Sequence, residues 1–200
     1  MEKIKRNKIT SVCVYCASST QADPVYYETA NVLGRLLGER RIRVINGAGN
    51  TGLMCALSDG ALAAGGEVTG VIPRFMVEQN WCHQGLTEVI AVDTMHERKQ
   101  KMANLSDALI ALPGGCGTLE ELLEAITWKQ LGLYLNPIII LNVKGYFNPL
   151  LEMLQRAVDE RFMRPQHAGL WVVASTPEEA VELIHTEPVW DASVRKLALV

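Results

Sequence analysis

The sequence predicts an α/β fold, a doubly wound and mainly parallel sheet with helices on both faces. Short apolar runs alternate along the 200-residue chain with longer amphipathic segments, which is the pattern of strand–helix–strand units. The runs Ala108–Leu112 and Ile138–Leu141 are apolar throughout, as expected for strands covered on both sides. Two glycine-rich segments each stand between a predicted strand and a predicted helix. Parallel sheets bind ligands at such turns, at the carboxyl ends of their strands.

The first half of the chain alternates strands and helices up to a loop of irregular pattern. The first helix is expected over Pro24–Arg40, because Asp23 is a suitable N-cap and proline is favoured at the first helical position. The pair Gly65-Gly66 ends the second helix, and Pro73 ends the strand that follows. The other expected elements are strands Ile9–Cys16, Ile42–Ile45, Glu67–Ile72 and Thr87–Val92, helix Leu53–Ala64, and a long loop from Arg74 to Leu86.

The second half continues the same alternation without a linker or an internal repeat. Its expected elements are helix Met95–Asn104, strand Ala108–Leu112, helix Leu119–Leu131, strand Pro137–Leu141, helix Asn148–Glu160, strand Trp171–Ala174 and helix Pro177–His185. We therefore expect a single domain over residues 1–200, with its core at about 9–185 and peripheral termini.

Composition excludes several classes of protein. Apolar residues make up 48% and charged residues 20%, which is typical of a globular domain. The net charge of −3 argues against nucleic acid as a partner, and no apolar run is long enough to span a membrane. The basic, polar segment 1–10 lacks the apolar core of a secretory signal, so a cytoplasmic protein is expected.

The cysteines and histidines predict neither a disulfide framework nor a metal site. Five cysteines in a chain without a secretory signal indicate reduced thiols. Cys13 and Cys16 form a C-x-x-C pair, but residues three apart on a strand face opposite sides. The four histidines lack the spacing of zinc ligands, so no metal is expected; they are His83, His96, His167 and His185.

The strongest local signal is the segment Pro113-Gly-Gly-Cys-Gly-Thr-Leu-Glu-Glu121, between a strand and a helix. Its three glycines allow a ligand to approach the backbone, and the following helix presents free N–H groups and a positive dipole end. We therefore favour a phosphate site, to which Thr118 adds a hydroxyl, over a plain tight turn. The segment matches neither a Walker A loop nor G-x-G-x-x-G.

Glu121 has two interpretations of equal weight. Thr118 and Glu121 have the spacing of a capping box, which would make Glu121 structural. A carboxylate beside a phosphate site would instead bind ribose hydroxyls or a water. The neighbouring Glu120 is interpreted as a structural acid that favours the helix dipole.

Three further segments lie near the same predicted edge of the sheet. The turn Asn46–Gly52 is either a second ligand loop or a place where a helix packs closely on the sheet. The helix that begins at Met95 carries Arg98 and Lys99, which either face solvent or contact a phosphate or base. Trp81, in the long loop, covers either a ligand, a subunit interface or the core.

Together these segments resemble a known family. Pro113–Glu121 resembles the P-G-G-x-G-T-x-x-E signature of the LOG family, and Met95-His-Glu-Arg-Lys99 resembles its M-x-x-R-K motif. Gly52-Leu-Met54, Val71-Ile-Pro73 and Thr127-Trp128 match as well, and the resemblance runs from about Val12 to about Arg161. These proteins are cytokinin riboside 5′-monophosphate phosphoribohydrolases, long mislabelled as lysine decarboxylases.

The resemblance implies a Rossmann-like fold, a homodimer, and hydrolysis of an adenosine 5′-monophosphate, often N6-modified, to free base and ribose 5-phosphate without a cofactor. By resemblance, Arg98 and Glu121 carry catalysis. The implied substrate-binding residues are Glu78, Lys99, Gly114, Gly115, Cys116, Gly117, Thr118, Leu119, Glu120 and Thr127.

Some positions depart from the family pattern. Cys116 stands where the family often has an aromatic residue, Ala17 where a glycine is usual, and Asn46 and Cys55 replace glycines. No departure removes an implied catalytic side chain. A second hypothesis is a non-catalytic nucleotide or molybdenum-cofactor carrier of related fold, which would not need both Arg98 and Glu121.

Overall fold

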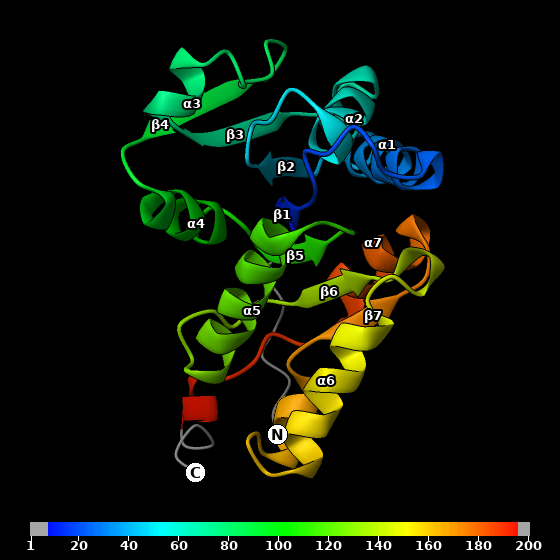
Figure 1. Cartoon of the computed structure of the whole chain (residues 1–200), viewed down its shortest axis with the longest axis vertical. Coiled ribbons are helices and arrows are strands. Elements are labelled where there is room, and N and C mark those ends of the chain that lie inside the picture. The colour runs from blue at the N-terminus through cyan, green and yellow to red at the C-terminus, as the bar shows by residue number, and fades with distance from the viewer. Residues whose placement is uncertain (1–7, 196–200) are drawn as a thin grey trace.

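The computed structural model of the chain describes residues 8–195, which are built around one parallel sheet (Figure 1). Its strand order is β4-β3-β2-β1-β5-β6-β7, and every pair of neighbours is parallel. The strands are β1 (Ser11–Tyr15), β2 (Arg43–Asn46), β3 (Val68–Pro73), β4 (Glu88–Val92), β5 (Ala108–Ala111), β6 (Ile138–Leu141) and β7 (Val172–Ala174). The predicted fold class is confirmed.

The sheet has its topological switch point beside β1. From β1 the chain adds β2, β3 and β4 in one direction, and then crosses back to place β5 on the other side of β1. Tyr15 at the end of β1 pairs with Ala111 at the end of β5. The loops after these two strands therefore diverge, and this is where doubly wound sheets bind ligands.

Helices cover both faces of the sheet. Leu33, Leu57 and Ile184, from three helices on one face, share a core cluster with Val12 and Val14 of β1. The opposite face is covered by α4, α5 and α6. The helices are α1 (Pro24–Glu39), α2 (Gly52–Ala63), α3 (Arg74–Glu78), α4 (Met95–Asn104), α5 (Cys116–Gln130), α6 (Asn148–Asp159) and α7 (Pro177–Thr186), with short 3₁₀ helices at Val143–Gly145, Pro165–Gly169 and Ala192–Val194.

Local signals explain several element boundaries. Asp23 accepts a hydrogen bond from the Val25 N–H with Pro24 at the first position of α1, as predicted. At the start of α4, Thr94 and Glu97 form a capping box that the sequence analysis missed. Cys13 and Cys16 face opposite sides of the sheet, and both thiols are free, as predicted.

The structure corrects three expectations. The predicted loop from Arg74 begins with α3, and α5 begins at Cys116 rather than Leu119, because Gly115 is its N-cap. The core also extends past residue 185, since Val194 is buried in the cluster under α5 and the Trp190 N–H donates to the Leu135 carbonyl. The remaining terminal residues, 1–7 and 196–200, lie outside the described residues. No described helix is long and apolar enough to cross a membrane.

Candidate active site

A cavity of about 630 Å³ opens at the switch point, at the carboxyl ends of β1 and β5. Both glycine-rich turns contribute to it, as do α4 and the N-terminal turns of α2 and α5. Its polar lining includes Ser18, Ser19, Asn50, Thr51, Arg98, Thr118, Glu120 and Glu121. Its apolar lining includes Met54, Ile72, Met76, Trp81, Met95 and Met102.

The second glycine loop, Pro113–Thr118, leads into the N-terminus of α5 at the edge of this cavity. A Cβ at Gly114 would lie 2.1 Å from the Thr118 hydroxyl, so packing requires that glycine. A Cβ at Gly115 or Gly117 would meet nothing within 4 Å. These two glycines therefore leave space beside backbone N–H groups at a positive helix end, which suits an anion such as a phosphate.

Arg98 is fixed inside the cavity by two backbone carbonyls. Its side chain is 9% exposed. Nε donates to the Val71 carbonyl at 3.0 Å, and Nη2 donates to the Gly47 carbonyl at 3.1 Å. The sheet positions both acceptor carbonyls, because Val71 lies on β3 and Gly47 comes directly after β2. Arg98 is therefore buried and held by the backbone, which excludes the interpretation that it lies on a solvated face.

Glu121 lies against Arg98, with 3.9 Å between its Oε1 and Nη1 of the arginine. The Glu121 side chain is 11% exposed, and its burial raises the pKa of the carboxyl to about 7 despite the opposing charge of Arg98. A carboxylate that loses its proton near neutral pH can stabilise a developing cation or orient a water. Perturbed groups of this kind concentrate at functional sites.

The capping-box interpretation of Glu121 is wrong. The N-cap of α5 is Gly115, which places Thr118 in the third helical position and Glu121 a further turn along. Glu121 therefore lies beyond the positions that cap the helix. Its burial beside Arg98 favours the functional interpretation.

Lys99 does not line the cavity. It is 3% exposed, and its Nζ forms ion pairs with Glu120 and, at 3.1 Å, with Glu124, both on α5. Burial alone would lower the pKa of Lys99, but the hydrogen bonds to the two carboxylates outweigh it and raise the pKa. In this structure Lys99 joins α4 to α5 through these two ion pairs.

The first glycine loop, Asn46–Gly52, is both structural and part of the cavity. The Asn46 side chain accepts a hydrogen bond from the Ala48 N–H and donates to Ser58 of α2, which holds the loop on the helix. Ala48 is buried with a left-handed φ of 62°. Gly47 and Gly49 line the cavity, and Gly47 supplies the carbonyl that binds Arg98.

Trp81 forms part of the cavity wall and is 51% exposed. Its loop is fastened to the first glycine loop, since the Asn50 N–H donates to the Trp81 carbonyl and the Asn50 side chain to the Asn80 carbonyl. An antiparallel bridge between Gly49 and Cys82 continues this contact. The location of Trp81 favours the interpretation that it covers a ligand.

Of the other predicted binding residues, some line the cavity and some do not. Gly115, Gly117, Thr118 and Glu120 line it. Leu119 is partly buried and packs against the core, and the Gly114 carbonyl accepts a hydrogen bond from the Tyr146 hydroxyl. Glu78, Cys116 and Thr127 are exposed outside the cavity lining of the described chain.

Asn50 and Thr51 line the cavity, which favours the interpretation of the turn Asn46–Gly52 as a ligand loop. The residues Tyr15–Ser19, at the end of β1 and just after it, also line the cavity, and the sequence predicted no ligand role for them. The signal that could have found them is their place at the carboxyl end of the central strand. Cys55, Asp59 and His83 also come together, from α2 and the loop before β4.

The fold and the site define a doubly wound α/β protein whose switch-point cavity suits a phosphorylated small molecule. Residues 54–184 match a family model described as "Possible lysine decarboxylase". The chain is 44% identical over 198 residues to cytokinin riboside 5′-monophosphate phosphoribohydrolase LOG7 of Arabidopsis thaliana, covering 98% of this chain and 91% of that one. The chain belongs to this family, the LOG family.

Another relative supports this assignment, and a solved structure shares the fold. A probable cytokinin riboside 5′-monophosphate phosphoribohydrolase of rice, Oryza sativa subsp. japonica, is 44% identical over 90% of this chain and 73% of its own. The structure of a molybdenum cofactor binding protein from Rippkaea orientalis is similar in fold, with a TM-score of 0.67 and 26% identity over 92% of this chain and 98% of that one.

Proposed function

We propose that this protein hydrolyses the N-glycosidic bond of cytokinin riboside 5′-monophosphates, which are N6-modified adenosine 5′-monophosphates, and releases the free base and ribose 5-phosphate. The observation that carries the proposal is the buried Arg98–Glu121 pair in a cavity beside an anion-binding helix terminus. The names of relatives that are 44% identical over nearly the whole chain support it.

Each part of the cavity has a role in this reaction. The 5′-phosphate binds at the backbone of Gly115 and Gly117 and at the Thr118 hydroxyl, which orients the ribose over Glu121. The apolar wall, which includes Met76 and Trp81, receives the base and its N6 substituent. Unmodified AMP, which fills less of this wall, is a second expected substrate.

The chemistry breaks the bond between the ribose C1′ and the base N9. Positive charge develops on the ribose, and the ionised Glu121 stabilises it or orients the attacking water. The water's oxygen bonds to C1′, and one of its protons ends on the base. Arg98 stabilises the negative charge on the leaving base or on the phosphate side. Removing one such positioned charge typically costs about 10²–10³ in rate.

The test measures release of free base from a panel of nucleoside monophosphates that includes AMP and N6-isopentenyl-AMP. We expect wild-type protein to release base, and Glu121→Gln to lose release while still melting cooperatively. Glu152→Gln, at an exposed position of α6 outside the cavity lining, is the matched control and keeps the activity. Tight nucleotide binding without base release from any substrate would support a non-catalytic carrier instead.

We also propose that the protein is a homodimer. Exposed apolar side chains lie on α3, the edge strand β4 and the start of α4, which are Phe75, Val77, Val89 and Met95. Light scattering of wild type should give a molecular mass of twice that of one chain, and Phe75→Glu should lower this mass toward that of a monomer. Phe162→Glu, at an exposed site after α6, is the matched control. The cytoplasmic location stays a prediction.

A further inference from the structure

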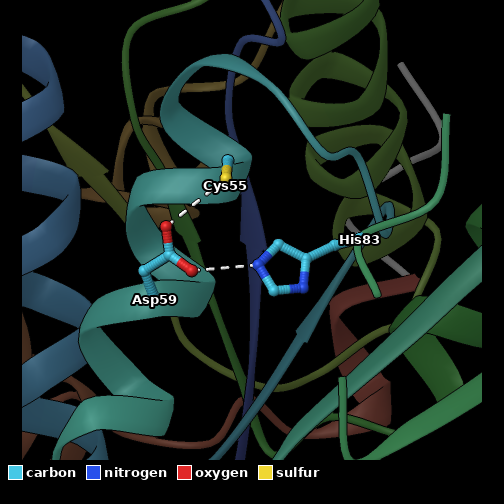
Figure 2. A group of neighbouring side chains, drawn as sticks. All are labelled: Cys55, Asp59 and His83. Carbon is cyan, nitrogen blue, oxygen red and sulfur yellow. Dashed lines mark hydrogen bonds and ion pairs between the residues drawn. The ribbon is translucent and has the colours of Figure 1, made fainter. Parts of the chain in front are cut away.

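Three side chains with metal-binding atoms meet beside the first glycine loop (Figure 2). Cys55 and Asp59 lie one turn apart on the same face of α2, with 3.4 Å between Sγ and Oδ2. His83 comes from the loop before β4, and its Nε2 lies 3.0 Å from Oδ1 of Asp59. The three ligand atoms all lie within 4.8 Å of one another.

We propose that Cys55, Asp59 and His83 bind one zinc ion, with the fourth position open to water. Thiolate, imidazole and carboxylate are the ligands that zinc takes in proteins, at about 2.0–2.3 Å. Tetrahedral geometry at those lengths separates donor atoms by about 3.3–3.8 Å. Cys55 and His83 contact different oxygens of Asp59, at 3.4 and 3.0 Å, and one ligand atom from each residue lies within 4.8 Å of the others, so side-chain rotations must bring the three donors to the tetrahedral separations. The spacing of the histidines alone had predicted no metal.

Charge balance suits a divalent cation here. Without a cation the cluster holds one negative charge, on Asp59, and Sγ of Cys55 lies 3.4 Å from that carboxylate. A bound cation stabilises the thiolate of Cys55, because the thiolate is its ligand. Zinc with one thiolate, one carboxylate and one neutral imidazole then forms a neutral complex. Since the Asp59 side chain is 57% exposed, solvent reaches the open position.

Binding requires one proton to leave and another to move. The Gly85 N–H donates to Nδ1 of His83, so the neutral ring now carries its proton on Nε2, which faces Asp59. When zinc takes Nε2, that proton moves to Nδ1 and the Gly85 peptide must turn away. Gly85 is exposed in a turn, where glycine rotates readily. The thiol of Cys55 loses its proton to solvent, so one proton is released per ion bound at pH 8.

The location gives the ion a structural consequence. Met54, next to Cys55, and Trp81, two residues before His83, both line the cavity. A zinc ion therefore fastens the loop that carries Trp81 to the first turns of α2, beside the cavity. Its binding is measured directly, so its failure and the failure of the proposed hydrolysis are distinguishable.

The test uses full-length protein freed of metal with a chelator and titrated with Zn²⁺ at pH 8 in buffers of different ionisation enthalpy. We expect about one ion bound and about one proton released per chain. Co²⁺ should give a thiolate-to-cobalt charge-transfer band in the near ultraviolet. Cys55→Ser should remove the band, and His83→Gln should weaken binding at least about 10-fold. Backbone NMR should show the Gly85 amide resonance shifting on Zn²⁺ addition.

Matched controls separate this cluster from other thiols and imidazoles. Cys116 and His96 are both exposed and lie outside the cluster. Cys116→Ser and His96→Gln should bind Zn²⁺ as wild type does, and circular dichroism should show all four variants folded. The proposal is overturned if Cys55→Ser and His83→Gln bind Zn²⁺ like wild type, or if wild type shows no charge-transfer band. The cluster would then be a hydrogen-bonded contact only.

Discussion

The guanidinium of Arg98 occupies the space that a side chain at Gly47 would take. Arg98 Nη2 donates to the Gly47 carbonyl at 3.1 Å, and a Cβ built on Gly47 would lie 1.7 Å from that nitrogen. The two residues lie 51 positions apart in the chain. The absence of a side chain at Gly47 is therefore a condition for the position of Arg98, beside Glu121.

Gly47→Ala should displace Arg98 and lower kcat/KM by about 10²–10³, the range for losing one positioned charge. The added methyl group cannot coexist with the guanidinium, whereas the cavity lets the arginine move aside, so the fold should be kept. Gly49→Ala is the matched control, because the added Cβ would lie 3.1 Å from the flexible Met54 side chain as its nearest neighbour. Its decrease in kcat/KM should be smaller. Equal losses in both variants would contradict the finding. The measurement is base release under subsaturating substrate, with thermal melting of both variants.

Glu121→Gln should stabilise the protein at high pH while it abolishes activity. The pKa of Glu121 is raised from 4.5 to about 7 in the folded state, so its contribution to stability is fully present below the unfolded pKa and is lost as pH rises through 7. The difference between the folded and unfolded pKa corresponds to a loss of roughly 3 kcal/mol in the free energy of unfolding above pH 7. Glutamine does not ionise, so the stability of Glu121→Gln does not fall over this pH range for this reason.

The measurement is chemical denaturation of wild type and Glu121→Gln at pH 5 and pH 8. The stability advantage of the variant should be small at pH 5 and near its full value at pH 8. Glu152→Gln, on the exposed face of α6, should show no such pH dependence. An advantage of the same size at both pH values would mean that ionisation of Glu121 is not its cause.

The sequence predicted the fold well because each strand and each helix boundary has a local cause. The apolar runs of β5 and β6, the cap at Asp23 and the glycines before α5 are all readable within a few residues. The start of α5 was misplaced because Thr118 and Glu121 match a capping box in spacing alone. Only the structure shows that Gly115, which offers no side chain, is the N-cap.

The site was less predictable because its contacts join distant segments. That Arg98 is buried depends on carbonyls of Val71 and Gly47, and no local pattern reports their position. The burial of Lys99 depends likewise on two glutamates of another helix. The resemblance to the LOG family selected the right helix, but the direction of each side chain came from packing.

Lys99→Met should move the acidic limb of the kcat/KM profile to higher pH. The wild-type profile should fall below about pH 7 as Glu121 takes up its proton. The charge of Lys99 lowers the Glu121 pKa, while Glu120 and Glu124 raise it. Removing the lysine takes away the first effect and leaves the two carboxylates without their common partner.

The same variant should lose about 1–3 kcal/mol of stability, less than for a fully buried pair because the Glu120 side chain is 57% exposed. Lys101→Met, at an exposed position of α4, is the matched control and should move neither the profile nor the stability. If Lys99 instead contacts the substrate, KM should rise at every pH with no movement of the limb.

Thiol reagents should modify one cysteine of the native protein much faster than the other four. Cys116 is exposed, whereas Cys13, Cys16 and Cys82 are buried. Cys55 is partly buried and its raised pKa, about 11, keeps it protonated at pH 8. A disulfide-exchange reagent with a chelator present should therefore give one rapid phase per chain, at least about tenfold faster than the rest, and Cys116→Ser should remove it. Two rapid phases in folded wild type, or a rapid phase that survives Cys116→Ser, would contradict this prediction. Mass spectrometry of the labelled peptide identifies the cysteine that reacts.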